Sequence, residues 1–182
     1  MKNEIATLAS GCFWCTEAIF NRLKGIISVL PGYAGGTTKN PTYDQIHNGD
    51  TGHAESIQIT FDSEIIPYEK ILDIFWHTHN PTTPNQQGHD YGSEYRSIIF
   101  YHDENQRKIA EKSKEEFQKE GAYQNKIVTE IIPYTNFYIA ENYHQNYYEN
   151  HKLNPYCTLI INPKINHLLK EYHSDIKEEF LK

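Results

Sequence analysis

The chain has 182 residues, of which 38% are hydrophobic and 23% charged, so we expect one folded domain over residues 1–182 rather than general disorder. Its net charge of −7 would repel the phosphates of nucleic acid, and no apolar run approaches the ~20 residues that a membrane span needs. Residues 1–10 lack the basic end and apolar stretch of a signal peptide, and three cysteines do not suit a disulfide framework. We therefore expect a monomeric protein of the reducing cytoplasm, without nucleic-acid or membrane partners.

Strand and helix patterns alternate through the first half of the chain. Apolar side chains recur at helical spacing after Cys12 and again after Pro67, whereas Ile57, Ile59 and Phe61 alternate with polar residues as in a half-buried strand. That order, β-α-β-β-α-β, is the split unit of ferredoxin-like folds and predicts an α+β, two-layer sandwich with a mixed sheet. Besides the strand around Ile59 and the helix that starts at Pro67, the predicted elements are strands at 4–9, 26–33 and 95–101 and a helix at 12–24.

The second half of the chain is predicted to add a strand and C-terminal helices. A helix over 104–120 is expected to start at the N-cap Asp103, with Gln106 in the capping-box position, and to end at Gly121. The other predicted elements are a strand at 126–133 and a final helix from Lys164.

The segment Gly11-Cys12-Phe13-Trp14-Cys15 lies where the first strand passes into the first helix. At such a junction Cys12 meets unpaired backbone N–H groups and the positive end of the helix dipole, which favour thiolate over thiol. Gly11 has no side chain, so a substrate could approach Cys12 closely. Cys15 is within reach of Cys12 if the first turn of the helix loosens. We therefore interpret Cys12 as the nucleophile of a thiol enzyme.

Three other interpretations of this cysteine pair stay open from the residues alone. The pair could be structural and buried beside a core Phe-Trp pair. It could bind zinc, although no second C-x-x-C completes four ligands, so a metal is not expected. It could belong to a thioredoxin-like dithiol oxidoreductase, the usual meaning of C-x-x-C near a strand–helix unit, but the strand order and the long polar-aromatic loops count against that class.

Two long loops, at about 35–53 and 80–94, exceed what the connections require and are rich in Gly, Asn, Asp and Tyr, so we expect them to be functional. Phenols and carboxyls in and beside them could donate hydrogen bonds, if one carboxyl is kept neutral by burial. Together with a thiolate, such donors suit a substrate with an apolar methyl group and a polarised oxygen. The phenols and carboxyls in question belong to Tyr43, Glu55, Asp90 and Tyr95. Each of these residues, taken alone, also has a common structural explanation.

Short motifs also run through the chain in a definite order. They are Gly11–Trp14, Gly32–Gly36, Asn40–Tyr43, Gly49–Glu55, Phe75-Trp76, Asn80-Pro81, Gln87-Gly88, Asp90, Gly92, Tyr95–Ser97, Ala140-Glu141 and Tyr143–Gln145. In combination and order, over about residues 5–157, these motifs resemble those of the A-type peptide methionine sulfoxide reductases.

This resemblance implies reduction of the S epimer of methionine sulfoxide, free or in proteins, and thus repair of oxidative damage. Cys12 would attack the sulfoxide sulfur and become a sulfenic acid. A protonated Glu55, with Tyr43 and Tyr95, would hydrogen-bond the oxygen and protonate it as it leaves.

The resemblance also implies how the site is lined and how it is recycled. Phe13 and Trp14 would wall the methyl pocket, and Asp90 would order the site and its water. A resolving thiol would form a disulfide that thioredoxin reduces, without metal or organic cofactor. Most relatives have Gly in place of Cys15 and often a glycine-rich tail with recycling cysteines, so the resolving cysteine is either Cys15, which we favour, or Cys157.

Overall fold

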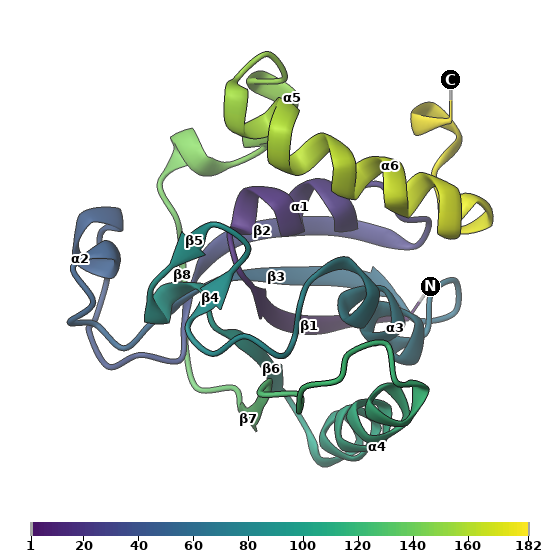
Figure 1. The fold of residues 1–182 in the computed structure, drawn as a ribbon, viewed down its shortest axis with the longest axis horizontal. Helices are drawn as coiled ribbons and strands as arrows, with labels where there is room; N and C mark the ends of the chain where they lie inside the picture. Colours follow the sequence, from purple (N-terminus) through teal and green to yellow (C-terminus); the bar gives the residue numbers. More distant parts are fainter. Residues whose placement is uncertain (1, 182) are drawn as a thin grey trace.

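The computed structural model describes residues 2–181, in which six strands form one sheet and a two-stranded hairpin lies beside it (Figure 1). The hairpin pairs β4 (Gln86–Gln87) with β5 (Asp90–Tyr91). The strands of the sheet are β1 (Asn3–Ser10), β2 (Ile26–Ala34), β3 (Ala54–Asp62), β6 (Ser97–Tyr101), β7 (Glu130–Pro133) and β8 (Phe137–Ile139).

The strands of the sheet lie in the order β7-β6-β1-β3-β2-β8. β1 is antiparallel to β3 and β6, and β2 is antiparallel to β3 and β8, whereas β6 and β7 run parallel. The predicted α+β class and mixed sheet are therefore confirmed. Ile57, Ile59 and Phe61 of β3 are fully buried and the two residues between them are half-buried, as the alternating pattern predicted.

Helices cover the sheet and pack on one another. They are α1 (Phe13–Phe20), α2 (Tyr43–His47), α3 (Tyr68–Thr78), α4 (Glu104–Glu120), α5 (Tyr147–Asn150) and α6 (Asn162–Glu171). α1 packs on β2 and β3, α6 runs alongside α1, and α4 packs on α3 and β6 (Figure 1). Buried aromatic side chains such as Phe20, Phe75 and Trp76 each contribute roughly 1.5–3 kcal/mol to this packing. Within residues 2–181, no helix combines the length and the apolar character that crossing a membrane requires.

Two predicted boundaries in the first half are wrong. α1 ends at Phe20, four residues earlier than predicted, because the chain tightens into a turn that leads to Gly25 at φ 80°. β6 starts at Ser97 rather than at residue 95, because residues Ser93–Tyr95 form a 3₁₀ turn. This turn leaves the Tyr95 side chain outside the strand ladder.

The predicted limits of α4 are confirmed. The Asp103 carboxylate accepts a hydrogen bond from the backbone N–H of Gln106 (2.8 Å), and Gly121 adopts the left-handed conformation at φ 72° that ends many helices. The Gln106 side chain accepts from the N–H of His102 (3.0 Å) instead of from the N-cap residue. These signals are local in sequence, which explains why they could be predicted.

The C-terminal part differs from the prediction in three places. β7 starts at Glu130, four residues later than predicted, because the N–H of Val128 donates to the carbonyl of Pro81 instead of to β6 (2.8 Å). β8 was not predicted at all. The last helix starts at Asn162 and is preceded by a π-helical turn at Cys157–Ile161.

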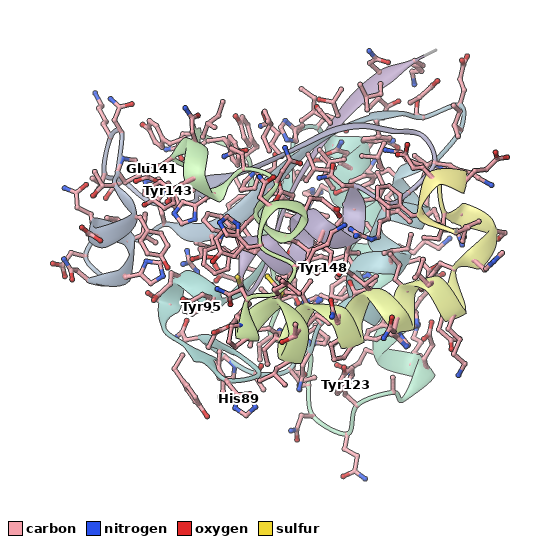
Figure 2. The ribbon with its side chains drawn as sticks, turned by 90° about the horizontal axis from the view of Figure 1, so that it is seen from above. His89, Tyr95, Tyr123, Glu141, Tyr143 and Tyr148 are labelled. Atoms are coloured by element: carbon pink, nitrogen blue, oxygen red, sulfur yellow. The ribbon has the colours of Figure 1, made fainter. Side chains whose placement is uncertain are left out.

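Both long loops contain structure of their own: α2 lies in the first and the β4–β5 hairpin in the second. α2 starts with a capping box, in which Thr42 accepts from the N–H of Gln45 and the Gln45 side chain accepts from the N–H of Thr42. β8 adds to the edge of β2 and carries the following segment, with Glu141, toward α2 (Figure 2). These additions assemble the functional site at one end of the sheet.

Candidate active site

Cys12 is the N-cap residue of α1, directly after β1, as the sequence predicted. Its carbonyl accepts hydrogen bonds from the N–H groups of Cys15 and Thr16 (3.1 and 3.4 Å), but its sulfur makes no capping bond to the helix. Gly11 has φ 89°, and a Cβ there would come within 2.6 Å of the Gln87 side chain. Glycine is therefore needed for the turn and to leave room for the Gln87 side chain, which lies where the sequence predicts the approach of a substrate.

Cys12 lines a cavity of about 180 Å³ whose lining residues come from six segments of the chain. Its thiol is only 7% exposed, so a substrate would reach the sulfur through this cavity. Seven of its lining residues are ones that the sequence singled out, and one is new. The seven are Cys12, Phe13, Trp14, Tyr43, Glu55, Asp90 and Tyr95, and the new one is Tyr156.

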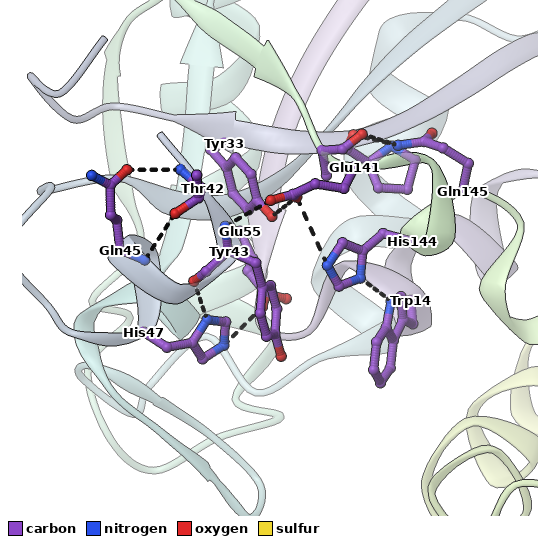
Figure 3. Close-up of polar contacts among 12 residues, drawn as sticks. Trp14, Tyr33, Thr42, Tyr43, Gln45, His47, Glu55, Glu141, His144 and Gln145 are labelled. Carbon is purple, nitrogen blue, oxygen red and sulfur yellow. Dashed lines mark hydrogen bonds and ion pairs between the residues drawn. The ribbon is translucent and has the colours of Figure 1, made fainter. Parts of the chain in front are cut away.

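Glu55 projects from β3 into this cavity and is 2% exposed. Its Oε2 accepts a hydrogen bond from the N–H of Phe13, the first residue of α1 (2.9 Å), and its Oε1 lies 3.3 Å from Nε2 of His47 (Figure 3). Burial raises the pKa of Glu55, while the contacts with His47 and Phe13 act in the opposite direction. The carboxyl is thereby suited to hold a proton in the same cavity as the sulfur.

Two phenols add hydrogen-bond donors to the cavity. Tyr43 starts α2, and its backbone N–H donates to Oε1 of Glu141 (2.9 Å), whose Oε2 accepts from the Tyr33 hydroxyl (2.8 Å; Figure 3). The Tyr95 hydroxyl lies 3.0 Å from Nε2 of His47. Burial raises the pKa of both Tyr43 and Tyr95, so each keeps its proton near neutral pH and remains a donor.

Phe13 and Trp14 form the apolar wall. The Trp14 ring stacks on Tyr147 with 3.7 Å between centroids and 6° between planes, and its Nε1 donates to Nδ1 of His144 (3.0 Å). Phe13 is 1% exposed and packs 5.8 Å from the Tyr33 ring. Both rings are fixed by contacts with neighbouring side chains, so the wall is rigid. Its two rings are large enough to contact a small apolar group.

The surroundings of Cys12 and Cys15 shift the pKa values of the two thiols in opposite directions. Burial raises the pKa of the Cys12 thiol well above its ordinary value, and the neighbouring Cys15 and Glu55 add to the rise. A hydrogen bond from Cys12 lowers the pKa of Cys15 to about 7. The first N–H of the helix, that of Phe13, is taken by Glu55 and does not reach the Cys12 sulfur. The surroundings therefore favour a proton on Cys12 and an ionised sulfur on Cys15.

Residues 4–177 match the family model described as peptide methionine sulfoxide reductase. The chain belongs to this family. A peptide methionine sulfoxide reductase MsrA of Saccharolobus solfataricus is 54% identical over 174 residues, which are 96% of this chain and 97% of the relative. An MsrA of Thermus thermophilus is 45% identical over 174 residues, 96% of this chain and 98% of the relative. The chain is thus a methionine sulfoxide reductase of the MsrA type.

Solved structures of the family resemble this fold. Mxr1 from Saccharomyces cerevisiae in its reduced form superposes with a TM-score of 0.78 at 36% identity, over 86% of this chain and 90% of Mxr1. Mxr1 in complex with Trx2 gives a TM-score of 0.55 at 31% identity, over 80% of this chain and 85% of that one. Membership of the reductase family sets aside the interpretation as a thioredoxin-like dithiol oxidoreductase. Among residues 2–181, no group of three or more His, Cys, Asp or Glu side chains is arranged to hold a metal ion.

Both candidates for the resolving cysteine of this reductase lie in one apolar cluster with Cys12. Cys15 and Cys157 are 1% and 0% exposed, and all three cysteines are free thiols. The sulfur of Cys15 lies 3.8 Å from the Tyr156 hydroxyl, which donates to Oδ2 of Asp90 (2.7 Å). Asp90 therefore orients a phenol that touches Cys15.

Sequence reasoning missed three residues of the reductase site: His47, His144 and Tyr156. His47 follows Tyr43 by four residues, which places the two on one face of a helix, whereas the composition of the segment predicts a loop. Its capping-box pattern, Thr42-Tyr43-Asp44-Gln45, was the available signal. For His144 the motif Tyr143–Gln145 was the available signal. Tyr156 reaches the cavity through tertiary packing, for which its neighbours in sequence offer no signal.

Proposed function

We propose that this reductase acts on the S epimer of methionine sulfoxide, free or in proteins, in the cytoplasm, with Cys12 as nucleophile and Glu55 as acid. The observation that carries this is the single cavity in which a thiol, a buried carboxyl and two phenols meet a fixed aromatic wall. A sulfoxide sulfur bears an oxygen, a methyl group, a longer chain and a lone pair. A cavity with distinct polar and apolar walls accepts one arrangement of these groups in front of a thiol.

The first step transfers oxygen from the substrate to the enzyme. Cys12 passes its proton to the Cys15 thiolate, and the Cys12 sulfur attacks the sulfoxide sulfur. Glu55 gives its proton to the oxygen, helped by hydrogen bonds from Tyr43 and Tyr95. The hydroxyl then passes from the substrate sulfur to the Cys12 sulfur as the bond between the two sulfurs breaks. Methionine leaves reduced by two electrons, and Cys12 is left as a sulfenic acid.

The second step returns the enzyme to its reduced state. Cys15 releases its proton to solvent and attacks the Cys12 sulfur, a disulfide forms, and the hydroxyl departs as water with a second proton from Glu55. The lowered pKa of Cys15, about 7, and its hydrogen bond with Cys12 support Cys15 over Cys157 as the resolving thiol. Thioredoxin is the proposed reductant, in line with the relative that was crystallised with Trx2.

Chiral methionine sulfoxide with dithiothreitol as reductant, and free methionine as readout, tests the chemistry. We expect methionine from the S epimer alone and none from Cys12→Ser. Glu55→Gln should slow the single-turnover rate by about 10² or more, since it removes the acid but keeps the size of the side chain. Normal turnover by Cys12→Ser would disprove the mechanism, and an unchanged single-turnover rate in Glu55→Gln would remove the acid role.

Thioredoxin-dependent turnover separates the two resolving candidates. We expect Cys15→Ser to release one methionine per enzyme and then stop, whereas Cys157→Ser should continue. The reverse result would assign the role to Cys157. Mass spectrometry of the oxidised enzyme, alkylated before digestion, would identify the bridged pair directly.

We also infer that β1, α1, β2, β3, α3 and β6 form a ferredoxin-like core in a single domain of residues 1–182, and that the protein is a monomer. The order β6-β1-β3-β2 with antiparallel neighbours supports the first part. One cooperative unfolding transition and a light-scattering mass near 21.3 kDa are the expected results.

A further inference from the structure

Glu55 has to release a proton twice in each catalytic cycle. The first goes to the sulfoxide oxygen and the second to the hydroxyl that leaves Cys12. Between these events the carboxylate must be re-protonated, yet it is 2% exposed and faces a cavity that substrate and product occupy. A group that joins Glu55 to solvent would speed this re-protonation.

His47 has the position for this task. It is the last residue of α2, its side chain is 25% exposed, and its Nε2 lies 3.3 Å from Oε1 of Glu55 (Figure 3). The Nε2 edge of the ring thus contacts the Glu55 carboxyl, while part of the side chain is exposed to water. Other acidic groups of the cavity are less suited: Asp90 is engaged by the Tyr156 hydroxyl at 2.7 Å, and burial keeps the phenol of Tyr43 protonated.

The hydrogen bonds of His47 determine which nitrogen titrates. Nδ1 lies 2.9 Å from the carbonyl oxygen of Tyr43, and a carbonyl can only accept, so Nδ1 carries a hydrogen in both charge states. Nε2 is therefore the nitrogen that gains and loses a proton. It is also the nitrogen that faces the Glu55 carboxyl and, at 3.0 Å, the Tyr95 hydroxyl.

Charges around His47 favour a shared proton. Burial lowers the pKa of His47, but the contacts with the Glu55 carboxyl and the Tyr43 carbonyl outweigh it, so the net pKa is raised. Because burial also raises the pKa of Glu55, the pair retains a proton near neutral pH. The titratable groups that face His47 are Glu55 on β3, Tyr43 on α2, Glu94 and Tyr95 on the 3₁₀ turn, and His144 after β8.

We propose that His47 re-protonates Glu55 between the two proton-transfer events of the cycle. Nε2–H of the imidazolium gives its proton to the Glu55 carboxylate, and the neutral ring then takes a proton from solvent at the same nitrogen. No electrons move in this step. When charged, Nε2 carries a hydrogen and cannot accept from the Tyr95 hydroxyl at 3.0 Å, so the Tyr95 O–H is free for the substrate. This role rests on the proposed acid function of Glu55, through which His47 acts.

His47→Gln keeps a polar side chain but cannot carry the proton. We expect its kcat with dithiothreitol to fall about tenfold at pH 8 and less than about twofold at pH 6, where buffer acids and hydronium re-protonate Glu55 directly. KM should not change. The matched control is His77→Gln: His77 also has Nδ1 on the carbonyl four residues earlier (2.8 Å) and a carboxylate 3.5 Å from Nε2, but it lies on α3 away from the cavity. Its kcat should equal that of the unmodified enzyme at both pH values.

A second variant and a direct titration test the proposal even if His47→Gln does not fold. His47→Ala should regain activity with added imidazole, in proportion to the imidazolium concentration. In the unmodified enzyme, an NMR titration of His47 should give a pKa above 6.5, and Glu55→Gln should lower it.

Three results would overturn the proposal. The first is an equal loss of kcat by His47→Gln at pH 6 and pH 8, together with no response of His47→Ala to imidazole. The second is no loss of kcat by His47→Gln at pH 8. The third is a pKa of His47 that is the same in Glu55→Gln as in the unmodified enzyme. Failure of the proposed function has a different signature. Glu55→Gln would then keep its single-turnover rate, whereas failure of the relay alone leaves Glu55→Gln slow and His47→Gln normal.

Discussion

Replacing Glu17 by glutamine should make the protein more stable at alkaline pH than the unmodified chain. Glu17 lies on α1 and is 2% exposed. Its Oε1 accepts a hydrogen bond from the N–H of Asn146 (2.7 Å), and its Oε2 has no hydrogen-bond partner among residues 2–181. Burial raises the pKa of Glu17 from its ordinary 4.5 to about 7, so the folded state prefers the protonated carboxyl.

The sign and size of the effect follow from proton linkage. Because the folded protein binds this proton more tightly than the unfolded chain, the contribution of Glu17 to stability is complete below pH 4.5 and is lost as the pH rises to 7 and above. A shift from 4.5 to about 7 corresponds to about 3 kcal/mol. Glutamine never ionises. The free energy of unfolding of Glu17→Gln minus that of the unmodified chain should therefore be about 3 kcal/mol larger at pH 8 than at pH 4.5.

Urea unfolding of both proteins at several values between pH 4.5 and pH 8 measures this difference. The comparison at each pH removes the contributions of all other titrating groups. Glu115→Gln, on α4 and away from α1, controls for the loss of one negative charge. A difference between Glu17→Gln and the unmodified chain that stays constant across the range would refute the reasoning, because it would mean that Glu17 titrates alike in both states.

Three further predictions concern other parts of the chain. Asp103→Ala should lower the free energy of unfolding by about 1 kcal/mol in a urea titration, because the N-cap hydrogen bond of α4 is lost. Cys12→Ala should raise the pKa of Cys15 above 7, measured by thiolate ultraviolet absorbance, because it removes the hydrogen bond that lowers this pKa; an unchanged value would contradict that cause. Trp14→Phe should raise KM several-fold more than it lowers kcat, because the ring loses its bond to His144 and with it the fixed position of the substrate wall.

The predictable part of the site consists of residues whose signals are local. The C-x-x-C segment follows a strand and starts a helix, and Cys12 accordingly lies at the N-cap of α1. The raised pKa of Cys12 could not be predicted, because it comes first from burial in the folded chain and also from Glu55, which is far away in sequence.

The same distinction applies to the fold. The caps of α4 are formed by neighbours in sequence and were predicted, whereas the start of β7 is decided by a bond from Val128 to Pro81. His47 combines both cases. Its helical spacing from Tyr43 is local, but its approach to Glu55 appears only once α2 has packed against β3.

The fixed indole of Trp14 provides the protein with its own optical reporter. The chain has two tryptophans. The other, Trp76, is 2% exposed, donates a hydrogen bond to Ser113, and lies in the core remote from the cysteines. Any change in tryptophan emission on mixing with sulfoxide, or on oxidation of the thiols, is therefore assigned to the ring beside Cys12. Stopped-flow fluorescence of the unlabelled enzyme should resolve substrate entry, methionine departure and disulfide formation as separate phases.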